Sequence, residues 1–320
     1  MKKILVIGGG AMGSAFTIPC IENKNIVTIT EPYSHTFIKD LSSKNKFHSA
    51  LKTKLPKKLI FKKFNKDLLK KKFDLIVIAL SLSGINFIGN ELKNFKIKTP
   101  ILVLTKGLKY EKKSNRILTI SEQLKKNYSG MNISVLKGPC LAKELSEKNQ
   151  TSVVIANKNI NVAKSIGRII STKYYITEYS KDIIGVEVCS AIKNIYSMII
   201  GAGQSLNASS NLFQKSLIEM KYLTKYFKGK DETTLGLAGV GDLYVSAAGG
   251  RNSKMGSYLG KGYTFKGAKK RFMPKDTVEG EQLAREIAPF IFKKIDKKKI
   301  PLMNNLLRTI INNKKLKIKV

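Results

Sequence analysis

The pattern of apolar and polar positions divides the chain into two parts. Up to about residue 180, short apolar runs alternate with amphipathic stretches, which is typical of a parallel sheet whose strands are connected by helices. The runs that predict strands are residues 4–7, 26–29, 59–61, 73–80, 100–104, 133–136, 152–156 and 174–177. Helices are predicted at residues 14–22, 85–95, 114–126 and 162–170. We therefore predict an α/β domain with a doubly wound sheet over residues 1–180.

The strand signals stop in the second part of the chain. Residues 185–206 form a long, nearly continuous apolar stretch with helical spacing, and further helices are predicted at residues 211–226, 253–259, 280–292 and 302–311. We predict an all-helical C-terminal domain over residues 181–320. No uninterrupted apolar run reaches the ~18 residues of a membrane span, so we expect no membrane span and a cytoplasmic location.

A glycine-rich loop follows the first predicted strand. Gly8, Gly10 and Gly13 have the G-x-G-x-x-G spacing of a dinucleotide-binding, Rossmann-type domain. Gly8 permits the tight turn, Gly10 lets a pyrophosphate approach the backbone, and Gly13 lets the next helix pack closely on the sheet. The N–H groups at the start of that helix then face the phosphates.

Glu31 lies at the end of the second predicted strand, about 20 residues after the glycines. A carboxylate there can accept a hydrogen bond from a ribose 2′-hydroxyl and would repel a 2′-phosphate. Glutamates are also common at strand ends on protein surfaces, and this alternative stays open. We predict that NAD(H) is favoured over NADP(H).

The net charge of +37 raises the alternative of a nucleic-acid-binding protein. The excess is almost entirely lysine, scattered along the whole chain, whereas base recognition favours arginine. A biased genome explains the composition equally well, so we expect anionic small molecules as partners and no nucleic acid. The three cysteines are widely spaced, and we expect neither a disulfide framework nor a metal site.

Two lysines stand at positions where chemistry is expected. Lys106 follows an apolar strand, with Gly107 opening space beside it, although a solvated lysine is the simpler alternative. Lys193 lies in the long apolar helix beside a polar stripe of Glu187, Ser190 and Asn194. Burial among apolar neighbours lowers the pKa of a lysine and prepares it as a general base. The alternative is a lysine whose ammonium reaches solvent.

Polar residues in the glycine-rich C-terminal half complete the candidates. Asp242 follows three closely spaced glycines and is placed to orient a lysine. Arg251 follows two glycines at a predicted helix start, where an arginine binds phosphate or carboxylate, and Asn252 is expected to cap that helix. Glu279 begins another predicted helix, and the alternative is an acid that only stabilises the helix dipole.

These motifs in this order resemble the NAD(P)-dependent glycerol-3-phosphate dehydrogenases over nearly the whole chain. The matching elements are Gly8-Gly9-Gly10-Ala11-Met12-Gly13, Lys106-Gly107, Gly138-Pro139-Cys140-Leu141-Ala142-Lys143-Glu144, Ala191-Ile192-Lys193-Asn194, Gly239-Val240-Gly241-Asp242 and Arg251-Asn252.

The resemblance implies reduction of dihydroxyacetone phosphate to glycerol 3-phosphate, which would supply phospholipid synthesis. It implies that Lys193, Lys106 and Asp242 are catalytic. The implied substrate ligands are Lys106, Gly138, Cys140, Lys193, Asp242, Gly250, Arg251 and Asn252. The implied cofactor ligands are Gly8, Gly10, Ala11, Met12, Gly13, Glu31, Lys106, Ala142, Arg251, Thr277 and Glu279.

The chain departs from the pattern of the bacterial members at three places. Gly249-Gly250 before Arg251 resembles the eukaryotic form of this loop, which is shorter than the usual bacterial one. Cys140 stands where bacterial members usually have Ser or Thr, and the basic residue that usually follows the second strand is missing, with Glu31 near that place. A ketopantoate reductase-like or hydroxyacid dehydrogenase-like enzyme remains the alternative, because it has the same two-domain plan. A homodimer is left open.

Overall fold

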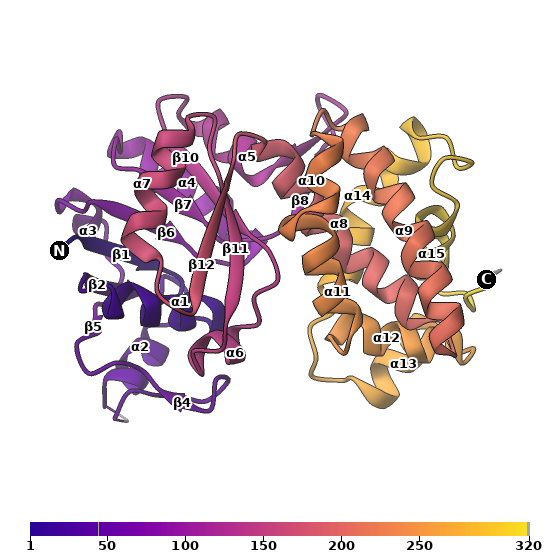
Figure 1. Cartoon of the computed structure of the whole chain (residues 1–320), viewed down its shortest axis with the longest axis horizontal. Helices are drawn as coiled ribbons and strands as arrows, with labels where there is room; N and C mark the ends of the chain where they lie inside the picture. The colour runs from indigo at the N-terminus through magenta and orange to yellow at the C-terminus, as the bar shows by residue number, and fades with distance from the viewer. Residues whose placement is uncertain (44, 319–320) are drawn as a thin grey trace. The chain divides into compact units, whose positions relative to one another are not determined.

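The computed structural model describes residues 1–43 and 45–318, except for the side chains at positions 35, 36 and 40. The chain forms two compact units (Figure 1). The first, called the sheet unit, contains residues 1–106 and 120–183; the second, called the helical unit, contains residues 107–119 and the chain from residue 184 onward. The predicted fold class, a doubly wound sheet followed by an all-helical part, is confirmed.

An eight-stranded sheet forms the centre of the sheet unit. Its strands, in spatial order, are β12 (Tyr175–Ser180), β11 (Thr151–Ala156), β10 (Ile133–Lys137), β7 (Ile101–Val103), β6 (Leu75–Ile78), β1 (Lys3–Ile7), β2 (Ile26–Thr30) and β5 (Ile60–Phe61). All neighbouring pairs are parallel except β10 and β11. The strand order reverses between β1 and β6, and ligands of such sheets bind beyond the strand ends at that point.

Helices cover both faces of this sheet. α1 and α7 lie in front of it in Figure 1 and α4 behind it, and α4 packs against α5. The helical elements are α1 (Ala11–Glu22), α2 (His35–Ser43), α3 (Asp67–Lys70), η1 (Leu82–Gly84), α4 (Ile85–Asn94), α5 (Ile120–Asn127), α6 (Ala142–Ser146) and α7 (Ile160–Ile170), and a small hairpin joins β3 (Phe47–His48) and β4 (Thr53–Lys54). Ile4, Leu5, Val6 and Ile7 of β1 are fully buried, as expected for a strand covered on both faces.

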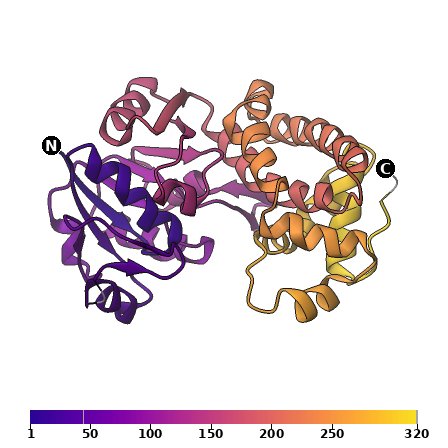
Figure 2. The same ribbon diagram turned by 60° about the horizontal axis from the view of Figure 1, so that its bottom comes forward.

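The helical unit is built around α8 (Ile183–Gly201). Its other helical elements are α9 (Leu206–Tyr226), α10 (Asp231–Leu235), η2 (Leu237–Gly241), α11 (Asp242–Ala247), α12 (Arg251–Gly260), α13 (Phe265–Phe272), α14 (Glu279–Lys294) and α15 (Pro301–Ile311), drawn in orange and yellow in Figure 2. Among the described helices, α8 alone is long and apolar enough to cross a membrane, but 94% of its apolar window is buried in the protein. It is the core helix of this unit.

Glycines let α12 lie against α8. A Cβ at Gly256 would stand 1.9 Å from the carbonyl oxygen of Met198, and one at Gly260 would stand 2.2 Å from that of Ala202. Because no side chain larger than hydrogen fits there, the two backbones approach closely. This packing holds the start of α12 beside the middle of α8.

The structure corrects two of the predicted elements. The helix predicted from residue 114 starts only at Ile120, because Arg116–Thr119 form β9, which pairs antiparallel with β8 (Leu108–Glu111). This hairpin packs on α14 through Leu108 and Ile117, and Tyr110 N–H donates to Glu286 at 2.9 Å. The hairpin therefore belongs to the helical unit, an excursion that the sequence analysis does not anticipate.

The long helix predicted to reach residue 206 is also shorter than expected. α8 ends at Gly201, and α9 begins at Leu206, with the Ser205 hydroxyl capping its first turn by accepting from Ala208 N–H at 3.2 Å. The cap gives α9 a start of its own and breaks the apolar run.

Candidate active site

The glycine loop after β1 has a geometry that requires two of its glycines. Gly8 has φ +118°, and a Cβ there would stand 2.5 Å from the carbonyl oxygen of Ala79. A Cβ at Gly13 would stand 2.1 Å from the carbonyl oxygen of Gly8. Any larger residue at either position would displace the turn from the strand or α1 from the sheet.

Gly10 has the opposite environment. It is the N-cap residue of α1, and a Cβ built on it meets nothing within 4 Å. Ala11 and Met12 follow in the first helical turn, where backbone N–H groups have no intrahelical partner. The open space beside Gly10 and the N–H groups of this turn are the features that bind anions at helix N-termini.

The peptide groups on both sides of Gly9 are fixed by three side chains. Its N–H donates to Glu31 Oε2 at 2.8 Å, and its carbonyl oxygen accepts from Ser14 Oγ at 2.8 Å and lies 3.2 Å from His48 Nε2. His48 is 2% exposed, and its Nδ1 accepts from Leu51 N–H, so Nε2 carries the proton that points at Gly9. Burial lowers the pKa of His48 below its usual value. Sequence analysis assigned Glu31 a place here but missed His48.

Four more predicted residues follow strands of the same sheet. Lys106 is half-buried and is the last residue of the sheet unit before the hairpin. Gly138 directly follows β10 with φ +131°, and Ala142 begins α6. Cys140 is half-buried, and its side chain packs against the apolar core of the sheet unit. Lys106 thus lies on the loop that follows β7, Gly138 and Cys140 lie on the loop that follows β10, and Ala142 is the first residue of the helix after it.

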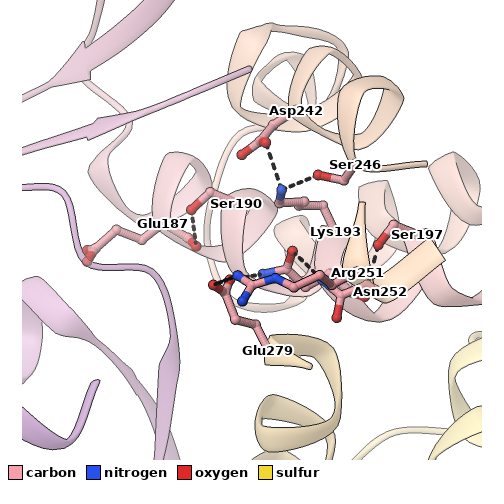
Figure 3. Close-up of polar contacts among 10 residues, drawn as sticks. Glu187, Ser190, Lys193, Ser197, Asp242, Ser246, Arg251, Asn252 and Glu279 are labelled. Carbon is pink, nitrogen blue, oxygen red and sulfur yellow. Dashed lines mark hydrogen bonds and ion pairs between the residues drawn. The ribbon is translucent and has the colours of Figure 1, made fainter. Parts of the chain in front are cut away.

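A buried ion pair joins α8 and α11 of the helical unit (Figure 3). Lys193 Nζ on α8 donates to Asp242 Oδ1 on α11 at 2.7 Å and to the hydroxyl of Ser246. Lys193 is 5% exposed and Asp242 2%. A carboxylate at this distance stabilises the ammonium form, which is the form that can donate a proton. The hydroxyl of Ser190, in the polar stripe beside Lys193, bonds instead to the carbonyl of Glu187 at 3.2 Å.

Asn194, the next residue of α8, is the centre of a second polar network (Figure 3). Its Oδ1 accepts from Asn252 Nδ2 at 3.1 Å, and its Nδ2 donates to Glu279 Oε2 at 3.3 Å. Glu279 Oε1 lies 3.5 Å from an Nη of Arg251. The network therefore brings together Arg251, Asn252 and Glu279, three of the predicted ligands.

The predicted capping role of Asn252 is wrong. Asn252 lies inside α12, which begins at Arg251 and has Gly250 as its N-cap residue. Its Oδ1 accepts from the N–H of Gly280 at 2.9 Å, in the first turn of α14. The side chain thus caps a different helix and ties α12 to α14.

Thr277, which the resemblance implies as a cofactor ligand, and Ser246, which was not predicted, lie in the helical unit. Thr277 is exposed and lies two residues before α14. Ser246 was not predicted, although its position four residues after Asp242 puts both side chains on one face of α11. That spacing was the available signal.

Comparison with known proteins places the chain in a family. A model described as the N-terminus of NAD-dependent glycerol-3-phosphate dehydrogenase matches residues 3–163, and one described as its C-terminus matches residues 182–320. An NADP(+)-dependent glycerol-3-phosphate dehydrogenase of Archaeoglobus fulgidus is 30% identical over 271 residues, which cover 81% of this chain and 80% of the relative. A glycerol-3-phosphate dehydrogenase [NAD(P)+] of Francisella tularensis subsp. holarctica is 29% identical over 308 residues, covering 91% of this chain and 88% of the relative.

A solved structure agrees with this assignment at the level of the fold. The crystal structure of a glycerol-3-phosphate dehydrogenase from Coxiella burnetii superposes with a TM-score of 0.86 at 24% identity and covers 98% of this chain and 96% of its own. Together with the two family models, which span both units, this supports one conclusion. The chain belongs to the NAD-dependent glycerol-3-phosphate dehydrogenase family of oxidoreductases.

Proposed function

We propose that this chain reduces dihydroxyacetone phosphate to sn-glycerol 3-phosphate, and catalyses the reverse oxidation, with NADH as the preferred cofactor. The observation that carries the proposal is the buried Lys193 ammonium, held by Asp242 and Ser246 in a chain of this family. The product would serve phospholipid synthesis.

Lys193 acts as the proton donor in the reductive direction. Reduction of a ketone turns its carbonyl oxygen into an alkoxide, which needs a proton and a positive charge beside it. The two acceptors on Asp242 and Ser246 fix the direction of Nζ. In the oxidative direction the same nitrogen accepts the proton from the alcohol. Lys106 holds the substrate oxygens as a second cation.

Arg251 and Asn252 bind the phosphate group. Arg251 is at the first position of α12, where the helix N-terminus also favours an anion. Its guanidinium has five N–H donors, and Glu279 orients it from one side without using them all. Asn252 Nδ2 donates one of its two hydrogens to Asn194, which leaves the other for a phosphate oxygen.

The glycine loop is proposed to bind the dinucleotide, which supplies the hydride when bound. Gly10 and the first turn of α1 contact the pyrophosphate, and Glu31 accepts from the ribose. The Glu31 carboxylate is half-buried and already accepts from Gly9 N–H at 2.8 Å and Tyr33 N–H at 3.0 Å, so it is fixed in place. A fixed negative charge repels a 2′-phosphate, which supports the preference for NADH over NADPH.

Turnover of the purified protein tests this function. Absorbance at the reduced-nicotinamide band is followed with dihydroxyacetone phosphate and with ketopantoate, each with NADH and NADPH. We expect activity with the phosphorylated ketone and NADH, and a loss of about 10²-fold or more in Lys193→Ala, the scale of a missing general acid. The matched control is Lys297→Ala, which removes an exposed lysine of the same unit. Turnover of ketopantoate alone would refute the proposal, and so would full activity of Lys193→Ala.

A further inference from the structure

Lys137 is a buried lysine for which neither the motifs nor the proposed mechanism has a use. It is the last residue of β10 and is 2% exposed. Its Nζ donates to three main-chain carbonyl oxygens, those of Val103 at 3.2 Å, Leu104 at 3.2 Å and Thr105 at 2.6 Å. These carbonyls form the end of β7 and the turn that follows it.

This turn leads directly into Lys106. The Thr105 carbonyl belongs to the peptide group that joins Thr105 to Lys106. The hydrogen bond from Lys137 therefore fixes the orientation of this peptide plane and, with it, the direction in which the Lys106 side chain leaves the backbone. The Thr105 hydroxyl also donates to the carbonyl of Leu80 at 2.7 Å, which ties the turn to the end of β6. Gly107 follows with φ +143°, a conformation that favours glycine. The backbone before Lys106 is therefore held from two neighbouring strands.

An ammonium group is an unusual choice for a purely structural contact. Burial of a charged group is unfavourable unless hydrogen bonds replace its water. The three donors of Lys137 match the three carbonyl oxygens at the end of β7. Its Nζ lies 2.6 Å from the carbonyl oxygen of Thr105, the residue before Lys106, so its charge adds to the positive potential at the loop that is proposed to meet an anionic substrate.

We propose that Lys137 is a positioning residue that sets the conformation of the turn at residues 105–107 and thereby the place of the Lys106 ammonium. The proposal rests on the proposed function in one respect, namely that Lys106 binds the oxygens of the phosphorylated ketone. Lys137 itself does not contact the substrate. Its effect is to keep the Lys106 ammonium where it can both bind the substrate oxygens and stabilise the negative charge that develops on them.

Steady-state kinetics of three variants test the positioning role. Lys137→Met keeps much of the volume but removes the donors and the charge, Lys137→Gln keeps a donor without charge, and Lys137→Arg keeps both. We expect Lys137→Met to raise the KM for dihydroxyacetone phosphate by about tenfold or more and to lower kcat, since small misplacements of a binding group have effects of this size. The KM for NADH should change less, and Lys137→Arg should recover most of the loss.

A merely structural role gives a different result. Lys137→Met would then lower the amount of folded enzyme and the apparent kcat but leave the KM for dihydroxyacetone phosphate unchanged. That outcome overturns the proposal, as does an arginine variant as impaired as the methionine variant. If Lys137→Met does not fold, the comparison of Lys137→Gln with Lys137→Arg decides by the same two criteria.

Hydrogen exchange keeps this test separate from the proposed function. In Lys137→Met, amides at residues 105–107 should exchange at least about tenfold faster than in the wild type, while those of β2 stay unchanged, because local opening is governed by local contacts. Thr105→Val, which removes the bond to Leu80, should loosen the same segment. If wild-type protein does not reduce dihydroxyacetone phosphate, the proposed function fails, but faster exchange still supports the hold of Lys137 on the turn. Unchanged exchange in Lys137→Met refutes that hold whatever the activity.

Discussion

Substitutions in the buried pair of Lys193 and Asp242 can distinguish its contribution to folding stability from its contribution to catalysis. Both side chains are almost completely buried, at 7% and 3% side-chain exposure, and their charged atoms are 2.7 Å apart. Removal of one partner leaves the other charge buried without its counterion, which typically costs about 3–5 kcal/mol of folding stability. Lys193→Met should fall in this range, because Asp242 then loses the ammonium that donates to its Oδ1 at 2.7 Å. Removal of both charges, in Lys193→Met with Asp242→Asn, should cost less than either single change.

Chemical denaturation measures these differences. The chain contains no tryptophan, so unfolding is followed by circular dichroism of the helices, and free energies are taken only where a single transition is seen. Turnover is measured on the same samples. The double variant should recover stability but not activity, which should stay about 10²-fold or more below wild type because the proton donor is missing.

A control variant and two outcomes test this prediction. Lys297→Met removes an exposed charge of the same unit and should change stability by no more than about 0.5 kcal/mol. Stability losses that simply add in the double variant would show that the two charges are not energetically coupled. Activity that returns in the double variant would remove Lys193 from the proposed mechanism.

Three further predictions concern the glycine loop and two buried titratable groups. Gly10→Ala should fold as stably as wild type, since its Cβ meets nothing within 4 Å, yet bind NADH at least about tenfold more weakly. Gly13→Ala should also lose about 1–3 kcal/mol of stability. Thermal melting and NADH titration compare the two variants, and equal melting temperatures would contradict the packing argument. Burial raises the pKa of the Glu219 carboxyl above 4.5, so the folded state holds this proton more tightly than the unfolded state and stability should fall as pH rises above 4.5. Urea unfolding midpoints of the wild type and of Glu219→Gln are measured as a function of pH. The difference between them, wild type minus variant, should fall as pH rises, and a difference that rises would contradict the prediction. Burial lowers the pKa of His48 below 6.5, so its contribution is complete above pH 6.5 and is lost as pH falls; His48→Gln should flatten that acid limb in the same assay, and an unchanged limb would exclude His48 as its cause.

The parts of the site that sequence alone predicts are those that depend on local spacing. The glycine loop is such a part, because its three glycines, the strand before them and the helix after them are contiguous. The apolar pattern around Lys193 likewise indicates burial, which the structure bears out at 5% exposure. The sequence also indicates that Asp242 orients a lysine. It does not say which lysine, because Lys193 lies 49 residues earlier in the chain and no local pattern links the two.

Contacts between distant segments account for what was missed. Asn252 was expected to cap its own helix because a cap is a local feature, whereas its oxygen in fact serves Gly280, 28 residues on. Glu219 accepts from the N–H groups of Leu302 and Met303 and so caps α15 from α9, which no local pattern indicates. The predicted helix from residue 114 includes β9 wrongly, and β8 is not predicted at all, because both strands are short and the surface they pack on lies far along the chain, on α14.

The hairpin has a practical consequence for dissecting the protein. A fragment cut near residue 180 would retain residues 107–119 but lose α14, leaving Leu108 and Ile117 without the surface that buries them. Excision is straightforward, because Leu108 and Thr119 are cross-strand partners and such pairs bring the chain ends to within about 5 Å. A linker of two or three small residues from Lys106 to Ile120 would therefore give a fragment of the sheet unit without the exposed apolar side chains of the hairpin, and titration with NADH and NADPH would test whether it binds either one.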